Sequence, residues 1–147
     1  MSLKDVLSWL ENEFGHPVPE DYLRFLIAGD FITTWRKNYI IDFDNEDILE
    51  ISEWFTYENL PLVYKNCLEE EMIEKFHLPI FDSCNCTIVI DCNIDSDSYG
   101  YVFSRTPVGY YDSGLGKNVY TELDLVAKSF AEIISNLKTT EELEEIL

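Results

Sequence analysis

The chain of 147 residues carries 29 acidic and 10 basic residues, a formal net charge of −19, and its length is that of one domain that buries its own core. This charge disfavours nucleic acid and anionic membranes as partners, because binding phosphates requires a cationic face. No run approaches the roughly 20 apolar residues of a membrane span, and the N-terminus lacks the pattern of a secretory signal. We therefore expect a single domain over residues 1–147, a cytoplasmic location and a basic protein partner.

Two amphipathic helices are predicted at the N-terminus. Apolar residues recur at helical spacing over residues 3–14, with Ser2 placed to cap the helix and Gly15 placed to end it. After a proline-rich break, Pro19 stands where a first helical turn tolerates proline, and an apolar stripe continues towards Gly29. The N-terminal segment thus predicts a helix pair.

The composition changes after this pair. Aromatic and β-branched residues predict two short strands, FITTW at 31–35 and NYIIDF at 38–43. A loop-rich acidic segment follows. Apolar residues at four-residue steps then predict a third helix from Pro61 to Phe76, interrupted by the next proline.

The C-terminal half begins with two strand patterns, TIVIDC at 87–92 and YGYVFSR at 99–105, separated by a polar turn. A helix is predicted from Asp124 to Leu137, and a short acidic helix over 139–147. Helices at both ends with strands between them predict an α+β fold, in which helices pack against a mostly antiparallel sheet.

Three of the four cysteines lie close together: Cys84, Cys86 and Cys92. On a continuous strand all three face the apolar side, and a rise of about 3.3 Å per residue puts Cys86 and Cys92 roughly 20 Å apart, too far for one zinc ion. Cys84 and Cys86 would share an ion only if the chain turns between them. A reactive thiol needs positive surroundings, whereas Asp82 and Asp91 flank this stretch. We predict buried apolar cysteines without metal or cofactor; stoichiometric zinc in the untagged protein would contradict this.

Alternating oxygen side chains resemble the start of a calcium-binding loop: Asp91, Asn93, Asp95 and Asp97. The pattern then fails, because such a loop requires Gly and Glu where this chain has Ser96 and Val102. A solvated hairpin turn is the preferred interpretation. His16 is next to a proline and His77 is near one, at the ends of predicted helices, which favours roles in turns. No phosphate-binding, nucleophile-elbow, zinc-protease or dinucleotide motif occurs. No catalytic residues are predicted.

The acids cluster in one stretch. Residues 38–64 contain seven acids and no lysine or arginine, with a tryptophan near each end of the acidic run. Aromatic residues ringed by charge are common at protein interfaces, although core packing is the preferred interpretation for each tryptophan. The predicted partner-binding residues are Trp35, Asp42, Asp44, Glu46, Asp47, Glu50, Glu53 and Trp54.

Several short motifs resemble, in order, segments of the SUKH superfamily, the Smi/Knr-like proteins. They are VPEDYLRFLIAGD at 18–30, LPIFDS at 78–83 followed by TIVIDC, YGYVF at 99–103 and VAKSFAEIISNL at 126–137. The resemblance extends over residues 3–138. It departs from the family at residues 83–86, where glycines are usual, and at Gly29-Asp30, where the family has two glycines.

The resemblance implies an α+β fold and, for bacterial members, an immunity protein that binds and neutralises a cognate toxin, frequently a nuclease. It also implies an alternative function, a regulatory or scaffolding module that binds other proteins, because fungal relatives are scaffolds in cell-wall and signalling regulation. The family has no shared catalytic residues to carry over. The charge agrees with the first role, because an acidic inhibitor is steered onto the cationic surface that a nuclease needs. A third possibility, an enzyme or ligand-binding domain, would require a deep polar pocket on the sheet.

Overall fold

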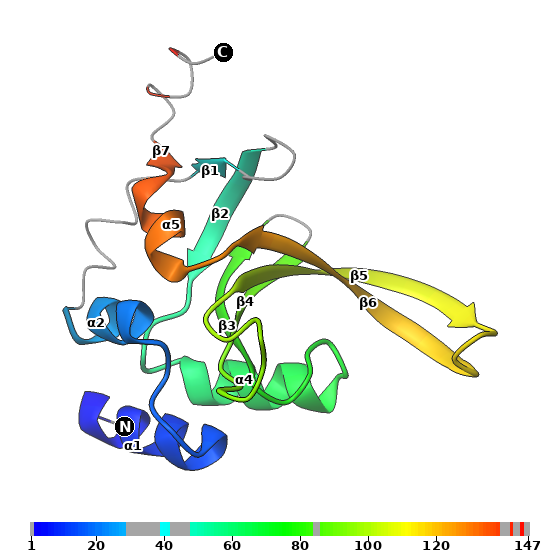
Figure 1. Cartoon of the computed structure of the whole chain (residues 1–147), viewed down its shortest axis with the longest axis horizontal. Helices are drawn as coiled ribbons and strands as arrows, with labels where there is room; N and C mark the ends of the chain where they lie inside the picture. The colour runs from blue at the N-terminus through cyan, green and yellow to red at the C-terminus, as the bar shows by residue number, and fades with distance from the viewer. Residues whose placement is uncertain are drawn as a thin grey trace.

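A single mixed arrangement of helices and antiparallel strands is seen in the computed structural model, which describes residues 2–28, 39–41, 48–83 and 86–138, together with Glu142 and Glu145. The elements are α1 (Leu3–Phe14), α2 (Glu20–Ala28), β1 (Tyr39–Ile41), β2 (Ile48–Trp54), α4 (Leu60–Glu69), β3 (His77–Ser83), β4 (Cys86–Asp91), β5 (Val102–Asp112), β6 (Lys117–Ala127), α5 (Phe130–Ser135) and β7 (Leu137–Lys138). The strands form one sheet in the order β6-β5-β4-β3-β2-β1-β7 (Figure 1). The α+β prediction is confirmed.

The first helix forms where its sequence signals predict. The Ser2 hydroxyl accepts the Asp5 N–H at 3.2 Å, and the Asp5 carboxylate accepts the Ser2 N–H at 3.3 Å, which completes a capping box. Gly15 ends the helix with φ 81°, a conformation that costs glycine little. The predicted second helix is likewise confirmed as α2.

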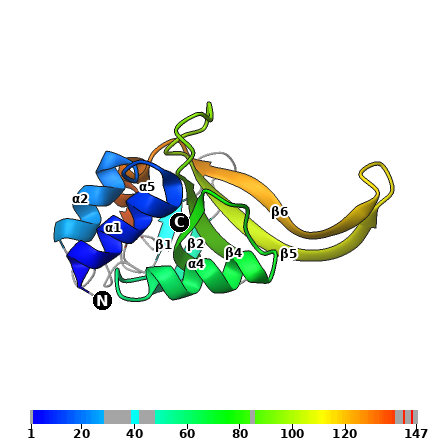
Figure 2. The ribbon, with the colours of Figure 1, turned by 90° about the horizontal axis from the view of Figure 1, so that it is seen from below.

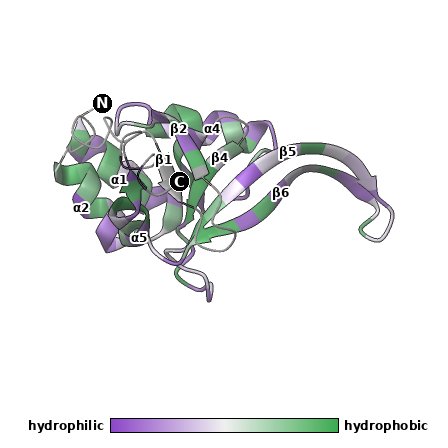
Figure 3. Ribbon diagram, turned by 90° about the horizontal axis from the view of Figure 1, so that it is seen from above, coloured by the Kyte–Doolittle hydropathy of each residue, from purple (hydrophilic) through white to green (hydrophobic). Residues whose placement is uncertain are grey.

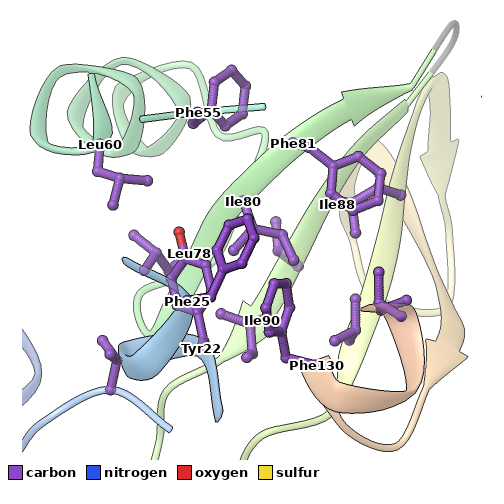
Figure 4. Close-up of a cluster of buried hydrophobic side chains, with 14 of the residues drawn as sticks. Tyr22, Phe25, Phe55, Leu60, Leu78, Ile80, Phe81, Ile88, Ile90 and Phe130 are labelled. Atoms are coloured by element: carbon purple, nitrogen blue, oxygen red, sulfur yellow. The ribbon is translucent and has the colours of Figure 1, made fainter. Parts of the chain in front are cut away.

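An aromatic cluster joins the helices to the sheet. The rings of Tyr22 and Phe25 on α2 each lie 5.0 Å from that of Phe130 on α5 (Figure 4). Trp54 of β2 lies 4.8 Å from Phe81 of β3 and 5.2 Å from Phe25. Large aromatic side chains dominate the apolar area that such a core removes from water, so this cluster is the main packing contact between α2, α5 and the sheet.

The cysteine segment forms part of this core. Ile88, Val89 and Ile90 on β4 are all fully buried, so both faces of this strand are covered. Cys92, directly after β4, is also fully buried, and burial raises the pKa of its thiol well above the ordinary value. Cys86 is half-buried, and Cys84 lies outside the described residues.

Several predicted element boundaries differ from those of the structure, and the strand predicted over 31–35 lies outside the described residues. The acidic segment is not loop throughout, because its second half is strand β2, paired with β1 and β3. A register shift between Ile51 and Glu53 breaks the alternation along this strand and still brings Trp54 into the core. Because of this bulge, the sequence of β2 does not show the alternation of apolar and polar residues that identifies a strand.

The third helix ends at Glu69 instead of Phe76. Glu71 and Phe76 have φ values of 59° and 78°, which no α-helix accommodates. Consecutive glutamates at a helix C-terminus are also unfavourable, because they face the negative end of the helix dipole. The predicted helix over 124–137 is similarly shortened to α5, since residues 124–127 belong to β6 and Leu137 begins β7. The predicted terminal helix lies largely outside the described residues.

The most distinctive feature is a two-stranded arm, defined here as residues 106–121. Strand β4 pairs with β5 only from Val102 to Arg105, so beyond that point β5 pairs with β6 alone among the described strands. The arm leaves the sheet on the side away from α1 and α2 and curves as it extends (Figures 1 and 2). A register shift between Pro107 and Tyr110 accompanies this curvature.

None of the helices in the described part of the chain is long and apolar enough to cross a membrane.

Candidate functional site

A groove of about 710 Å³ lies between the arm and the loop that follows α4. Its lining residues come from that loop, from β5 and β6, and from the turn between them: Glu71, Ile73, Glu74, Arg105, Tyr111, Leu115, Gly116, Lys117, Asn118, Val119 and Thr121. Apolar and polar residues both contribute, in keeping with the mixed hydropathy along the arm (Figure 3). A site of this size and composition suits a polypeptide segment or a small ligand.

Arg105 holds the base of the groove together. Its side chain is 8% exposed, and Nη2 lies 3.2 Å from the Glu74 carboxylate. Nη2 also lies 3.1 Å from Nδ1 of His77, while Nη1 donates to the Thr121 hydroxyl at 2.9 Å. One guanidinium thus connects the loop, β3 and β6, and this fixes the position of the loop relative to the arm.

His77 is part of the same polar cluster and does not lie in a turn as predicted, since it begins β3. Because arginine only donates, Nδ1 of His77 accepts and its proton resides on Nε2. Burial lowers the pKa of this imidazole, the positive charge of Arg105 lowers it further, and Glu74 and Asp91 oppose the shift. The ring stacks on Phe103 with 6.0 Å between centroids. His77 is therefore neutral at neutral pH.

This lowered pKa predicts acid sensitivity. Below a pH of about 6.5 the unfolded chain takes up a proton on His77 that the folded chain does not, so the free energy of unfolding falls as the pH falls. The His77→Gln variant keeps a hydrogen-bond acceptor for Arg105, and its side chain takes up no proton in this pH range. We expect its stability, measured by urea unfolding between pH 7 and 5, to fall less steeply than that of the wild type. Parallel curves would contradict this.

A smaller hollow of about 260 Å³ adjoins the groove, and its lining includes Asp91 and Asn93 of the calcium-like sequence pattern. There the Asp91 carboxylate accepts the Asn93 N–H at 2.8 Å and the Ser98 hydroxyl at 2.6 Å. The Asn93 side chain in turn accepts the Asp95 N–H at 3.1 Å. These oxygens hold the hairpin turn, and among the described residues no three His, Cys, Asp or Glu side chains are grouped to hold a metal ion.

The predicted partner-binding residues are only partly visible in the structure. Glu50 and Glu53 are exposed on β2. Trp54 is 2% exposed, and its ring is packed among aromatic side chains, so its interpretation as a surface anchor is corrected to that of a core residue. The remaining predicted residues lie outside the described ranges: Trp35, Asp42, Asp44, Glu46 and Asp47.

Glu53 has an acidic neighbour on the same face of the sheet. It lies directly opposite Asp82 in the β2–β3 register. Burial raises the pKa of the Asp82 carboxyl, the hydrogen bond from the Thr87 hydroxyl at 3.0 Å opposes this, and the negative charge of Glu53 raises it again. Two carboxylates thus create a negative potential at this part of the sheet.

A neutral residue in place of Asp82 is expected to stabilise the fold. Because the folded pKa is raised, the contribution of Asp82 to stability is present at low pH and lost as the pH rises. The Asp82→Asn variant removes the like-charge pair and keeps an acceptor for Thr87. We expect its free energy of unfolding at pH 7 to rise by about 0.2–1 kcal/mol, with no gain at strongly acidic pH. Asp124→Asn, at an exposed position on β6, is the control; an equal gain there would contradict the explanation.

The groove residues are absent from the sequence-based candidates. The available signal was the pair of strand-like runs at 102–112 and 117–127, joined by the glycine-containing turn DSGLG. Pro107 and Gly109 interrupt the first run and mimic a loop. Nothing in the sequence links these runs to residues 71–74, because only the folded chain brings them together.

A family model described as SMI1 / KNR4 family (SUKH-1) matches residues 3–136, which include every residue that lines the groove. No curated protein matches the chain.

Proposed function

Because the chain belongs to the SMI1 / KNR4 family (SUKH-1), we propose that it is a non-enzymatic immunity protein, which binds and neutralises a cognate bacterial toxin through an acidic surface. Members of this family are generally immunity or regulatory proteins that act by binding other proteins. The proposal narrows this shared role, the binding of other proteins, to one class of partner, a bacterial toxin.

The charge of the chain is the observation that supports this partner class. With 29 acidic against 10 basic residues, the molecule attracts cationic surfaces over long range and repels nucleic acid. A nuclease toxin presents a cationic surface to its substrate. An acidic protein that covers this surface associates quickly and excludes the substrate.

The proposed contact surface is the acidic segment around β2. Glu50 and Glu53 are its exposed described members, and Asp82 adds negative charge beside Glu53. The acids at 42–47 continue the same segment. Exposed ion pairs contribute little each, so apolar contacts must supply much of the affinity. Trp35 remains a proposed apolar anchor for the partner. Trp54 is no longer proposed as an anchor, because its side chain is buried.

Charge reversal tests this surface. In the variant that combines Asp42→Lys, Asp44→Lys, Glu50→Lys and Glu53→Lys, we expect association with the toxin encoded by the adjacent gene to slow about tenfold or more at low salt. The difference should shrink as salt is added. Stopped-flow fluorescence measures the rate.

The control reverses four acids elsewhere and so matches the net charge: Glu11, Asp95, Asp97 and Asp124. Slowing of equal size in this control would show that only net charge matters and would contradict a local contact surface. The chain should also protect cells that express the toxin. Failure to protect, with no toxin gene adjacent, would contradict immunity and favour a regulatory scaffold of the Smi/Knr type.

A further inference from the structure

Exposed apolar side chains are concentrated on the β5–β6 hairpin. Seven large apolar residues of the described chain are well exposed, and four of them belong to these strands and their turn: Tyr110 at 47%, Tyr111 at 64%, Leu115 at 64% and Leu123 at 41%. Single exposed apolar residues are ordinary, but a group on one element marks an interaction surface. An arm whose tip is exposed on both faces gains little stability from these residues, so their role lies outside the fold.

Two of these residues line the groove. Tyr111 and Leu115 lie at the outer end, Val119 lies between them and the base, and Ile73 contributes from the loop after α4. Ile73 is only 5% exposed, so it fixes the loop to the body while still contacting the groove. The floor is thus apolar over much of its length.

The wall on the body side is acidic. Residues 69–74 include four exposed glutamates and no basic residue, and two of these glutamates, Glu71 and Glu74, line the groove. Lys75, the next residue, lies over the ring of Phe76 and does not line the groove. Of the two cations that do, Arg105 is buried against Glu74 and Lys117 lies towards the tip. A chain that enters the groove at its base therefore meets carboxylates first.

We propose that this groove binds a segment of a partner protein that carries lysine or arginine beside aliphatic or aromatic side chains. The apolar side chains contact Tyr111, Leu115 and Val119, and the basic ones lie against Glu71 and Glu74. The inference rests on the proposed protein-binding function and assigns to it a second contact surface, distinct from the acids around β2. A second copy of this chain is a poor occupant, because each copy carries a net charge of −19.

The groove exists before any partner binds. Arg105 fixes the loop through Glu74 and the base of the arm through Thr121. The positive φ of Glu71 turns the chain directly after α4, and Glu71 and Glu74 then line the groove. A prearranged surface binds more tightly, because less conformational entropy is lost on binding.

Selection from a phage-displayed library of random short peptides tests the proposal, with the purified full chain as bait. We expect enriched peptides to combine basic with apolar residues. Their affinity, measured by fluorescence anisotropy, should fall about tenfold or more in the double variant Tyr111→Ser/Leu115→Ser, as for central interface residues. Enrichment of acidic peptides, or no enrichment, would overturn the proposal.

A matched control is available. Ile27 and Leu62 are 55% and 64% exposed and line neither hollow, so the Ile27→Ser/Leu62→Ser variant should bind the selected peptides like the wild type. Equal losses in both double variants would overturn the proposal. Circular dichroism melting establishes that both variants fold. If light scattering shows a dimer that only the groove variant dissociates, the occupant is a second copy and the proposal is wrong.

Toxin protection separates this inference from the proposed function. If groove variants protect cells as well as the wild type does, the groove inference fails and the immunity function stands. If selected peptides bind the groove while no toxin is neutralised, the groove inference stands and the immunity function fails.

Discussion

Replacing Trp54 with alanine is expected to lower the free energy of unfolding by about 3–5 kcal/mol. The side chain is 2% exposed and contacts Phe25 and Phe81, with Phe130 beyond them at 6.3 Å. Truncation removes buried apolar area and leaves a cavity where α2, α5 and the sheet meet. Urea unfolding followed by circular dichroism measures the loss.

Trp54→Phe is the matched control. It keeps an aromatic ring and removes the indole N–H, which finds no acceptor among the described residues. We expect a loss of about 1–2 kcal/mol, well below that of the alanine variant. An alanine variant as stable as the wild type would contradict the core assignment and restore Trp54 as a candidate surface residue.

Replacing Glu74 with alanine is expected to cost about 2–3 kcal/mol, far more than its exposure implies. The Glu74 side chain is 72% exposed, but its partner Arg105 is 8% exposed. Without the carboxylate, a buried guanidinium loses its counter-charge, and Nε of Arg105 already lacks a partner among the described residues. Thermal and urea unfolding measure the change.

Two further variants test this explanation. Glu70→Ala, at an exposed position four residues earlier in the sequence, should change the free energy of unfolding by no more than about 0.5 kcal/mol. Combining Glu74→Ala with Arg105→Met removes the orphaned charge, so this double variant should be more stable than Glu74→Ala alone. If the two losses simply add, the pair is not coupled.

Elements specified by local signals were predicted well from the sequence. The first helix begins and ends at the predicted residues, because a capping box at Ser2 and a glycine at position 15 act within a few residues of the helix. Strands β4 and β5 were recognised from their β-branched and aromatic residues.

Elements that depend on tertiary contacts were missed. Strand β2 carries exposed glutamates and a bulge, and it is stabilised by its position between β1 and β3. Beyond Glu69 the apolar periodicity of the third helix continues although the helix does not, because Phe76 reaches the core from a loop and packs 5.9 Å from Phe14. Apolar residues therefore recur at helical spacing beyond the end of α4, although the chain there is not helical.

The candidate site depends still more on long-range structure. Net charge is a property of the whole chain, and it favours a basic partner without locating the contact. The groove joins residues 71–74 to residues 105–121 through Arg105, and a pattern read along the chain does not show this pairing. Burial likewise decides between the two predicted roles of Trp54, since an aromatic residue beside acids suits both surface and core.

The outer edge of β6 has one further consequence. In the described sheet this strand of 11 residues is the last on its side, so its backbone offers a template on which another molecule can add a strand. Lys117, Glu122 and Asp124 are exposed along it and act as gatekeepers against fibril growth. Replacing two of these three charges, as in Glu122→Ala/Asp124→Ala, would therefore expose the protein to aggregation through this edge.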